Sequence, residues 1–91
     1  MDDLKGRPRA REDVVFRPLA DEWVIYDSRT DQLHVLNGTA ALVWSCCDGS
    51  HTVDAIAEAV RENLDGAPPP DQLLEDVRGV LVELSREGLL E

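Results

Sequence analysis

The chain has 91 residues, the length of one small domain, because single domains usually contain about 50 to 200 residues. Nine Lys and Arg oppose nineteen Asp and Glu, and the net charge of −10 argues against a nucleic-acid partner, which binds a basic face. Neither an apolar stretch of about 18 residues nor a basic start followed by an apolar run is present, so we expect a soluble, cytoplasmic protein that does not bind membranes.

The charge is distributed unevenly along the chain. Residues 1–20 contain five basic and four acidic residues, whereas residues 21–91 contain four basic and fifteen acidic ones, a net charge of −11. Gly6, Pro8 and alternating charges predict a disordered N-terminal arm over residues 1–12. We therefore predict that the folded domain covers residues 13–91.

Three short segments read as β-strands. Residues 14–19 and 22–26 are rich in β-branched and aromatic residues, and residues 32–36 follow a polar turn. Short connections between consecutive strands indicate an antiparallel meander, and Pro18 restricts the first strand to an edge. Such a sheet has two faces, of which a short chain can cover only one.

Helical periodicity begins after the third strand. Asn37 or Thr39 can cap a first helix, which Gly49 follows in a conformation that favours glycine. Ser50 or Thr52 can cap a second helix. The apolar positions at helical spacing in these two segments are Ala40, Val43, Trp44 and Cys47, then Val53, Ile56, Ala57, Val60 and Leu64.

A third helix is predicted after the proline-rich break at residues 65–70. It starts near Pro70 or Asp71 and ends at Gly88. Its apolar stripe consists of Leu73, Leu74, Val77, Val80, Leu81 and Leu84. The predicted fold is α+β: a three-stranded antiparallel sheet followed by a three-helix bundle (β-β-β-α-α-α), similar to a winged helix-turn-helix.

The residues that carry catalytic or metal chemistry form no recognisable motif. Cys46 and Cys47 are adjacent, which prevents an ordinary disulfide between them, and neither has zinc-ligand spacing, so we expect both to pack as small apolar residues. His34 lies within a strand and His51 in a polar turn, without a nucleophile nearby in sequence. We expect no catalytic residues, no metal and no cofactor, which leaves a binding module rather than an enzyme.

Several segments together resemble the PqqD family of peptide chaperones, also called the recognition element of ribosomally made and modified peptides. The resemblance covers about residues 14–91. The stretch from Leu36 to Trp44, followed by Asp48-Gly49 and Thr52-Val53, is its most specific part. The other matching segments are residues 14–17, 21–27 and 76–77, Leu81, Leu84 and residues 88–90.

The resemblance implies a function that the residues alone do not indicate. Members of the family bind the leader segment of a precursor peptide and present it to a modifying enzyme, often a radical-SAM protein. The same module serves lasso-peptide and other pathways. The leader adds a strand to the sheet edge beside the third helix. Carried over to this chain, the resemblance implies a pairing edge at Gln32, Leu33, His34, Val35 and Leu36, and a groove wall at Leu74, Val77, Arg78 and Leu81.

Alternatives remain open at the level of single residues and of function. Arg78 either pairs with an acidic leader side chain or with Glu75, and Val77 and Leu81 either line the groove or belong to the core. The alternative functions are a winged-helix DNA-binding regulator, which the acidic third helix disfavours, and an adaptor that binds a protein but no peptide. Both a monomer and a dimer formed through the open sheet edge are compatible with the sequence.

Overall fold

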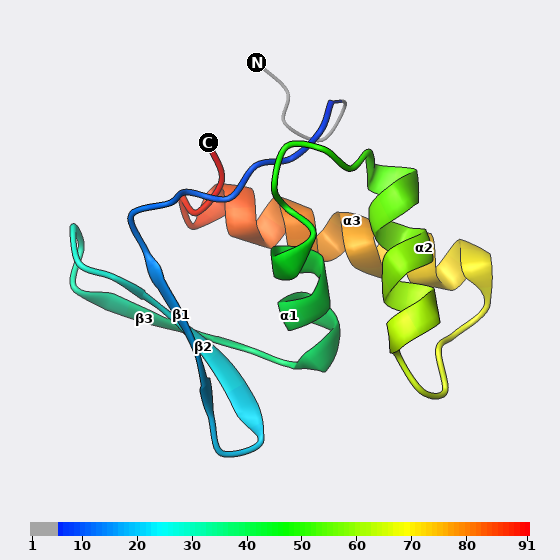
Figure 1. Cartoon of the computed structure of the whole chain (residues 1–91), viewed down its shortest axis with the longest axis horizontal. Coiled ribbons are helices and arrows are strands. Elements are labelled where there is room, and N and C mark those ends of the chain that lie inside the picture. Colours follow the sequence, from blue (N-terminus) through cyan, green and yellow to red (C-terminus); the bar gives the residue numbers. More distant parts are fainter. Residues whose placement is uncertain (1–5) are drawn as a thin grey trace.

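The computed structural model describes residues 6–91, and its order of elements confirms the predicted α+β fold. The strands are β1 (Val15–Leu19), β2 (Glu22–Asp27) and β3 (Gln32–Leu36), and the helices are α1 (Gly38–Ser45), α2 (Val53–Asn63) and α3 (Pro70–Arg86). The sheet lies at one end of the molecule and α2 at the other, with α1 between them and α3 running along the helical part (Figure 1).

The three strands form an antiparallel sheet in the order β1-β2-β3, so that β1 and β3 are its two edges. The register places Ile25 between Phe16 and His34, and Val24 between Arg17 and Val35. The edge strand β1 contains Pro18, which has no N–H to offer, whereas β3 contains no proline. The edge of β3 therefore keeps every backbone donor.

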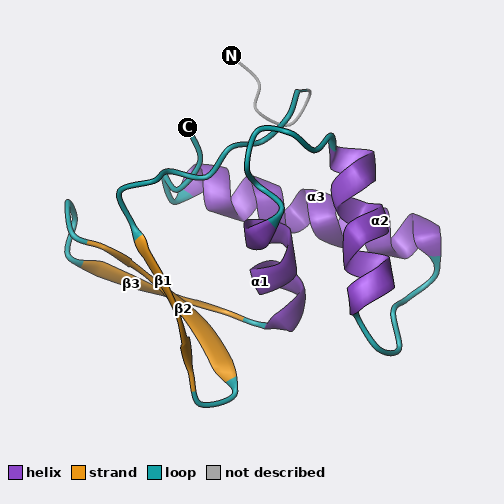
Figure 2. Ribbon diagram, viewed as in Figure 1, coloured by secondary structure: helices purple, strands orange, loops and turns teal. Residues whose placement is uncertain are grey.

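Only one face of the sheet is covered by the helices. Ile25 and Leu36 point to α1 and are buried, and Trp23 lies on this same inner face, where its ring stacks on that of Phe16 at 5.2 Å. The outer face carries apolar side chains that are exposed; Leu33 and Val35 are 57% and 56% accessible. This agrees with the expectation that a short chain covers only one face of the sheet. Figure 2 shows the sheet projecting from the helical part.

The helix ends follow from the capping residues. The Asn37 side chain accepts a hydrogen bond from the Ala40 N–H at 2.8 Å, and the Thr52 hydroxyl accepts one from the Ala55 N–H at 3.2 Å. Gly49 and Gly88, which follow α1 and α3, have φ angles of 83° and 74°. These conformations strain any side chain with a Cβ atom, so glycine is favoured at both turns.

A single core lies between the inner sheet face and the three helices. Its members are mostly the apolar positions expected from helical spacing: Ile25, Leu36, Ala40, Val43, Trp44, Cys47, Ile56, Val60, Leu73, Val77, Leu81, Leu84, Leu89 and Leu90. Cys47 is buried and its thiol donates to the Val43 carbonyl, as expected of a packing cysteine. Across residues 6–91, no helix combines the length and apolar character that a membrane-spanning segment requires.

The folded domain begins earlier than the predicted residue 13. Pro8 is buried and its carbonyl accepts from the Gly49 N–H, while the Ala10 N–H donates to the Cys47 carbonyl at 2.7 Å. Arg11 N–H donates to the Leu89 carbonyl. These contacts join the segment to the turn after α1 and to the C-terminal residues (Figure 1). The alternating charges that suggested a solvated arm belong partly to ion pairs; residues 1–5 of that prediction lie outside the described residues.

Candidate functional site

A groove of about 640 Å³ runs between β3 and α3. On the strand side it is lined by His34, Val35 and Leu36. Within residues 6–91, β2 contributes nothing to this lining, so the groove lies on the side of β3 that faces away from β2. That side is the open edge of the sheet, where backbone N–H and C=O groups are available to another chain.

The groove has an apolar floor and an acidic wall. The floor is formed by Leu36, Ala40, Val80, Leu84 and Leu89. The wall on the helix side carries the carboxylates of Glu75, Asp76, Glu83 and Glu87. Within residues 6–91, no lysine or arginine lines the groove. The groove therefore combines apolar contact area with concentrated negative charge.

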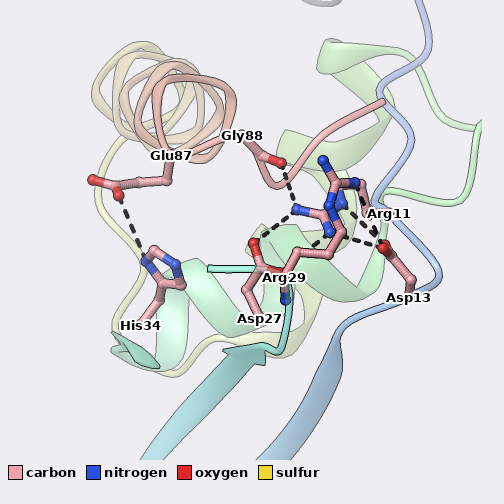
Figure 3. A network of polar contacts seen from close by, with 7 residues as sticks. All are labelled: Arg11, Asp13, Asp27, Arg29, His34, Glu87 and Gly88. Carbon is pink, nitrogen blue, oxygen red and sulfur yellow. Dashed lines mark hydrogen bonds and ion pairs between the residues drawn. The ribbon is translucent and has the colours of Figure 1, made fainter. Parts of the chain in front are cut away.

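His34 connects the strand side of the groove to the end of α3. Its Nδ1 lies 3.7 Å from a carboxylate oxygen of Glu87 (Figure 3). Its Nε2 is buried and has no hydrogen-bond partner among the described residues. The imidazole ring therefore lies between β3 and the end of α3.

The helix residues predicted to form the groove wall lie elsewhere. Val77 and Leu81 are 0% accessible and belong to the core, so the alternative considered for them above holds. Leu74 is half-buried and Arg78 is exposed, and neither lines the groove. Nearer the end of α3, Arg86 pairs with Glu83 at 3.1 Å. The carboxylates, not Arg78, are the charged groups beside the strand edge.

The residues that do line the groove lie on a different face of α3 from the predicted ones. Asp76, Gly79, Val80, Glu83 and Glu87 lie at i, i+3, i+4, i+7 and i+11. Their shared spacing was visible in the sequence. A helix face with both polar and apolar residues has the same pattern as a solvent-exposed surface, so the spacing alone did not identify these residues as a site. Gly79 is notable because a Cβ atom added there meets nothing within 4 Å. Its missing side chain leaves space in the groove.

A buried ion pair supports the strand that precedes this site (Figure 3). Asp27, at the end of β2, is 2% accessible, and its carboxylate accepts from the Arg11 guanidinium at 2.9 and 3.3 Å. Arg11 also donates to Asp13 at 2.8 and 2.9 Å and to the Gly88 carbonyl at 3.0 Å. One guanidinium therefore links the N-terminal segment, the sheet and the turn after α3.

Stability is expected to decrease in acid because of this ion pair. The hydrogen bond from Arg11 lowers the pKa of Asp27 below its ordinary value of about 4. A carboxyl group whose pKa is lower in the folded chain stabilises the fold above its unfolded-state pKa, and this contribution is lost as the pH falls through the folded-state pKa. We expect the Tm to fall as the pH decreases below about 4, less steeply in Asp27→Asn, when unfolding is followed by circular dichroism. Equal slopes in both chains would contradict this assignment.

The fold and the groove together define a small α+β domain with an open sheet edge beside a helix-lined groove. The family described as Coenzyme PQQ synthesis protein D (PqqD) matches residues 22–90. The chain belongs to the PqqD family, which confirms the resemblance noted in the sequence. No curated protein matches the chain.

Two solved structures share the fold. The chain is 22% identical to the protein in "TbiB1 in Complex with the TbiA(beta) Leader Peptide", with a TM-score of 0.74 over 91% of this chain and 94% of that one. It is 19% identical to "Lasso peptide synthetase B1 complexed with the leader peptide", with a TM-score of 0.78 over 94% of this chain and 99% of that one. At these identities the similarity establishes the fold, and in each case the similar protein is in complex with a leader peptide.

Proposed function

We propose that this domain binds the leader segment of a ribosomally synthesised precursor peptide by strand addition to β3 and presents it to a modifying enzyme. The observation that carries the proposal is the open, proline-free edge of β3 beside the groove of α3. A guest backbone placed there satisfies the free N–H and C=O groups, and its side chains enter the groove. Membership of the PqqD family and the two leader-bound neighbours support this choice over a DNA-binding regulator.

The domain acts in this proposal without catalysing a reaction. Its contribution is to hold the leader so that the following part of the precursor reaches the active site of the enzyme, with a cytoplasmic radical-SAM enzyme as the first candidate. Holding one end raises the effective concentration of the other end at that active site. The acidic character of α3 disfavours the regulator, whose recognition helix would have to approach phosphates.

Hydrogen exchange on the full chain tests the strand-addition step. The probes are leader peptides of precursors encoded beside this protein. Bound peptide is expected to slow exchange of the amides of β3 by at least about tenfold, because edge amides gain hydrogen-bond partners. Amides of α2, far from the groove, serve as the internal reference. Protection at β1 in place of β3, or at neither edge with any of these peptides, would contradict the proposal.

Replacing Gly79 tests the groove without touching the core. Gly79→Leu is expected to weaken leader binding by at least about tenfold, since the new side chain occupies the space beside β3. Gly79→Ala is the matched control: it is expected to raise the free energy of unfolding by about 0.5–1 kcal/mol, because alanine favours the helix, with a smaller effect on binding. Isothermal titration calorimetry and urea unfolding measure the two effects. Unchanged binding by Gly79→Leu would exclude this groove as the site.

A further inference from the structure

A strand added to β3 presents its side chains alternately to two different surroundings. Side chains on one side face α3 and the groove. Those on the other side lie beside Leu33 and Val35, which are more than half exposed on the outer face of the sheet. Cross-strand neighbours on one face of a sheet are close enough to pack. Apolar guest residues at these positions would cover the exposed side chains of Leu33 and Val35.

The positions that face α3 meet the opposite chemistry. Glu75, Asp76, Glu83 and Glu87 line the groove, and Arg86, which pairs with Glu83, is itself 70% accessible and lies outside the lining. The carboxylate of Glu87 is 3.7 Å from His34. Local charge in the groove is therefore negative, in addition to the net charge of −10 of the whole chain. An acidic peptide is repelled both by the carboxylates in the groove and by the net negative charge of the whole chain, and a basic peptide is attracted by both.

The shape of the groove also matches long basic side chains. Lysine and arginine have apolar stems that pack on apolar surface while their charged heads stay at the polar rim. Val80 and Leu84 offer that surface, and Glu83 and Glu87 lie at the rim. These two carboxylates are four residues apart on α3, about 6 Å along the axis, close to the ~6.6 Å between alternate residues of a strand.

We propose that the guest of this groove is a cationic strand, with lysine or arginine at alternate positions facing α3 and apolar residues at the positions between them. This specificity rests on the proposed function, and it assigns the choice of peptide to Glu83 and Glu87. It replaces the predicted pairing of Arg78 with an acidic leader residue.

Selection from a library of random peptides tests the specificity on the full chain. Peptides enriched by display against the immobilised protein at low ionic strength are expected to carry basic residues at alternate positions. Their affinity is expected to fall by about 3- to 30-fold in Glu83→Gln/Glu87→Gln, the effect of losing two partly exposed ion pairs. Glu58→Gln/Glu62→Gln on α2 is the matched control, because it removes the same charge. Glu58 pairs with Arg61 three residues later, as Glu83 pairs with Arg86.

The outcomes separate the specificity from the function. Alternating basic residues, together with a loss confined to the Glu83/Glu87 variant, support the proposal. Two results would overturn the cationic specificity without contradicting strand addition. One is enriched peptides that protect the β3 amides but lack basic residues, and the other is peptides that bind the Glu83/Glu87 variant as tightly as the Glu58/Glu62 control. Failure of every enriched peptide to protect the β3 amides would count against strand addition itself, and so against both proposals.

Discussion

Replacing Leu81 by alanine is expected to lower the free energy of unfolding by about 2–5 kcal/mol. Leu81 is 0% accessible and lies in the core, where removing its methyl groups leaves a cavity that the packed surroundings fill only in part. Because a small domain is stabilised by only about 5–15 kcal/mol, the variant loses a large share of its stability. Urea unfolding followed by circular dichroism measures the change.

Leu74→Ala is the matched control for this prediction. It makes the same chemical change two turns earlier on the helix, at a side chain that is only half-buried, and is expected to cost about 1 kcal/mol. Neither residue lines the groove, so the leader affinity of the folded fraction is expected to be similar in both variants. A loss of leader binding by the Leu81→Ala variant, under conditions where the variant is fully folded, would indicate that Leu81 contacts the peptide.

Replacing Arg11 by alanine is expected to lower the Tm by at least about 10 °C. The substitution leaves the Asp27 carboxylate buried at the end of β2 without its guanidinium partner. A buried charge without a partner strongly destabilises the fold, even where the intact pair contributes little net stability. It also removes a donor to the Gly88 carbonyl, which links the N-terminal segment to the turn after α3. Differential scanning calorimetry gives the Tm directly.

Arg29→Ala is the control for the charge lost in Arg11→Ala. The Arg29 side chain is 69% accessible and lies 3.7 Å from Asp13, the same carboxylate that Arg11 contacts. An exposed pair of this kind contributes little, so the Tm is expected to change by no more than about 3 °C. Similar shifts in both variants would mean that the buried geometry of Arg11 is not what stabilises the fold.

The comparison of sequence and structure is most instructive on α3. Its apolar stripe of Leu73, Leu74, Val77, Val80, Leu81 and Leu84 extends around a wide arc of the helix. Periodicity identified the helix and its apolar side correctly. It did not identify which part of that arc meets the core, because this depends on how the helix is rotated against α1, α2 and the sheet. Val77 and Leu81 were therefore ambiguous until the packing was known.

The N-terminal segment shows the same limit in a different form. Alternating charges over residues 1–12 are typical of a solvated arm, and a local sequence pattern cannot identify a partner 16 residues away. Arg11 and Asp27 become neighbours only after the sheet has formed and β2 ends beside the segment. The hydrogen bonds of Pro8 and Ala10 to the turn after α1 likewise depend on the assembled fold.

By itself, the sequence determined the three strands and the three helices, and it narrowed each of the first two helix caps to two residues, because hydrophobic period, capping side chains and turn residues act over a few neighbouring positions. It also excluded a basic nucleic-acid surface and contained the resemblance that the family match confirms. The tertiary structure decided which helix face meets the open strand edge and so made the groove acidic through Asp76, Glu83 and Glu87. Such a face is defined by the rotation and packing of whole elements, which no local pattern specifies.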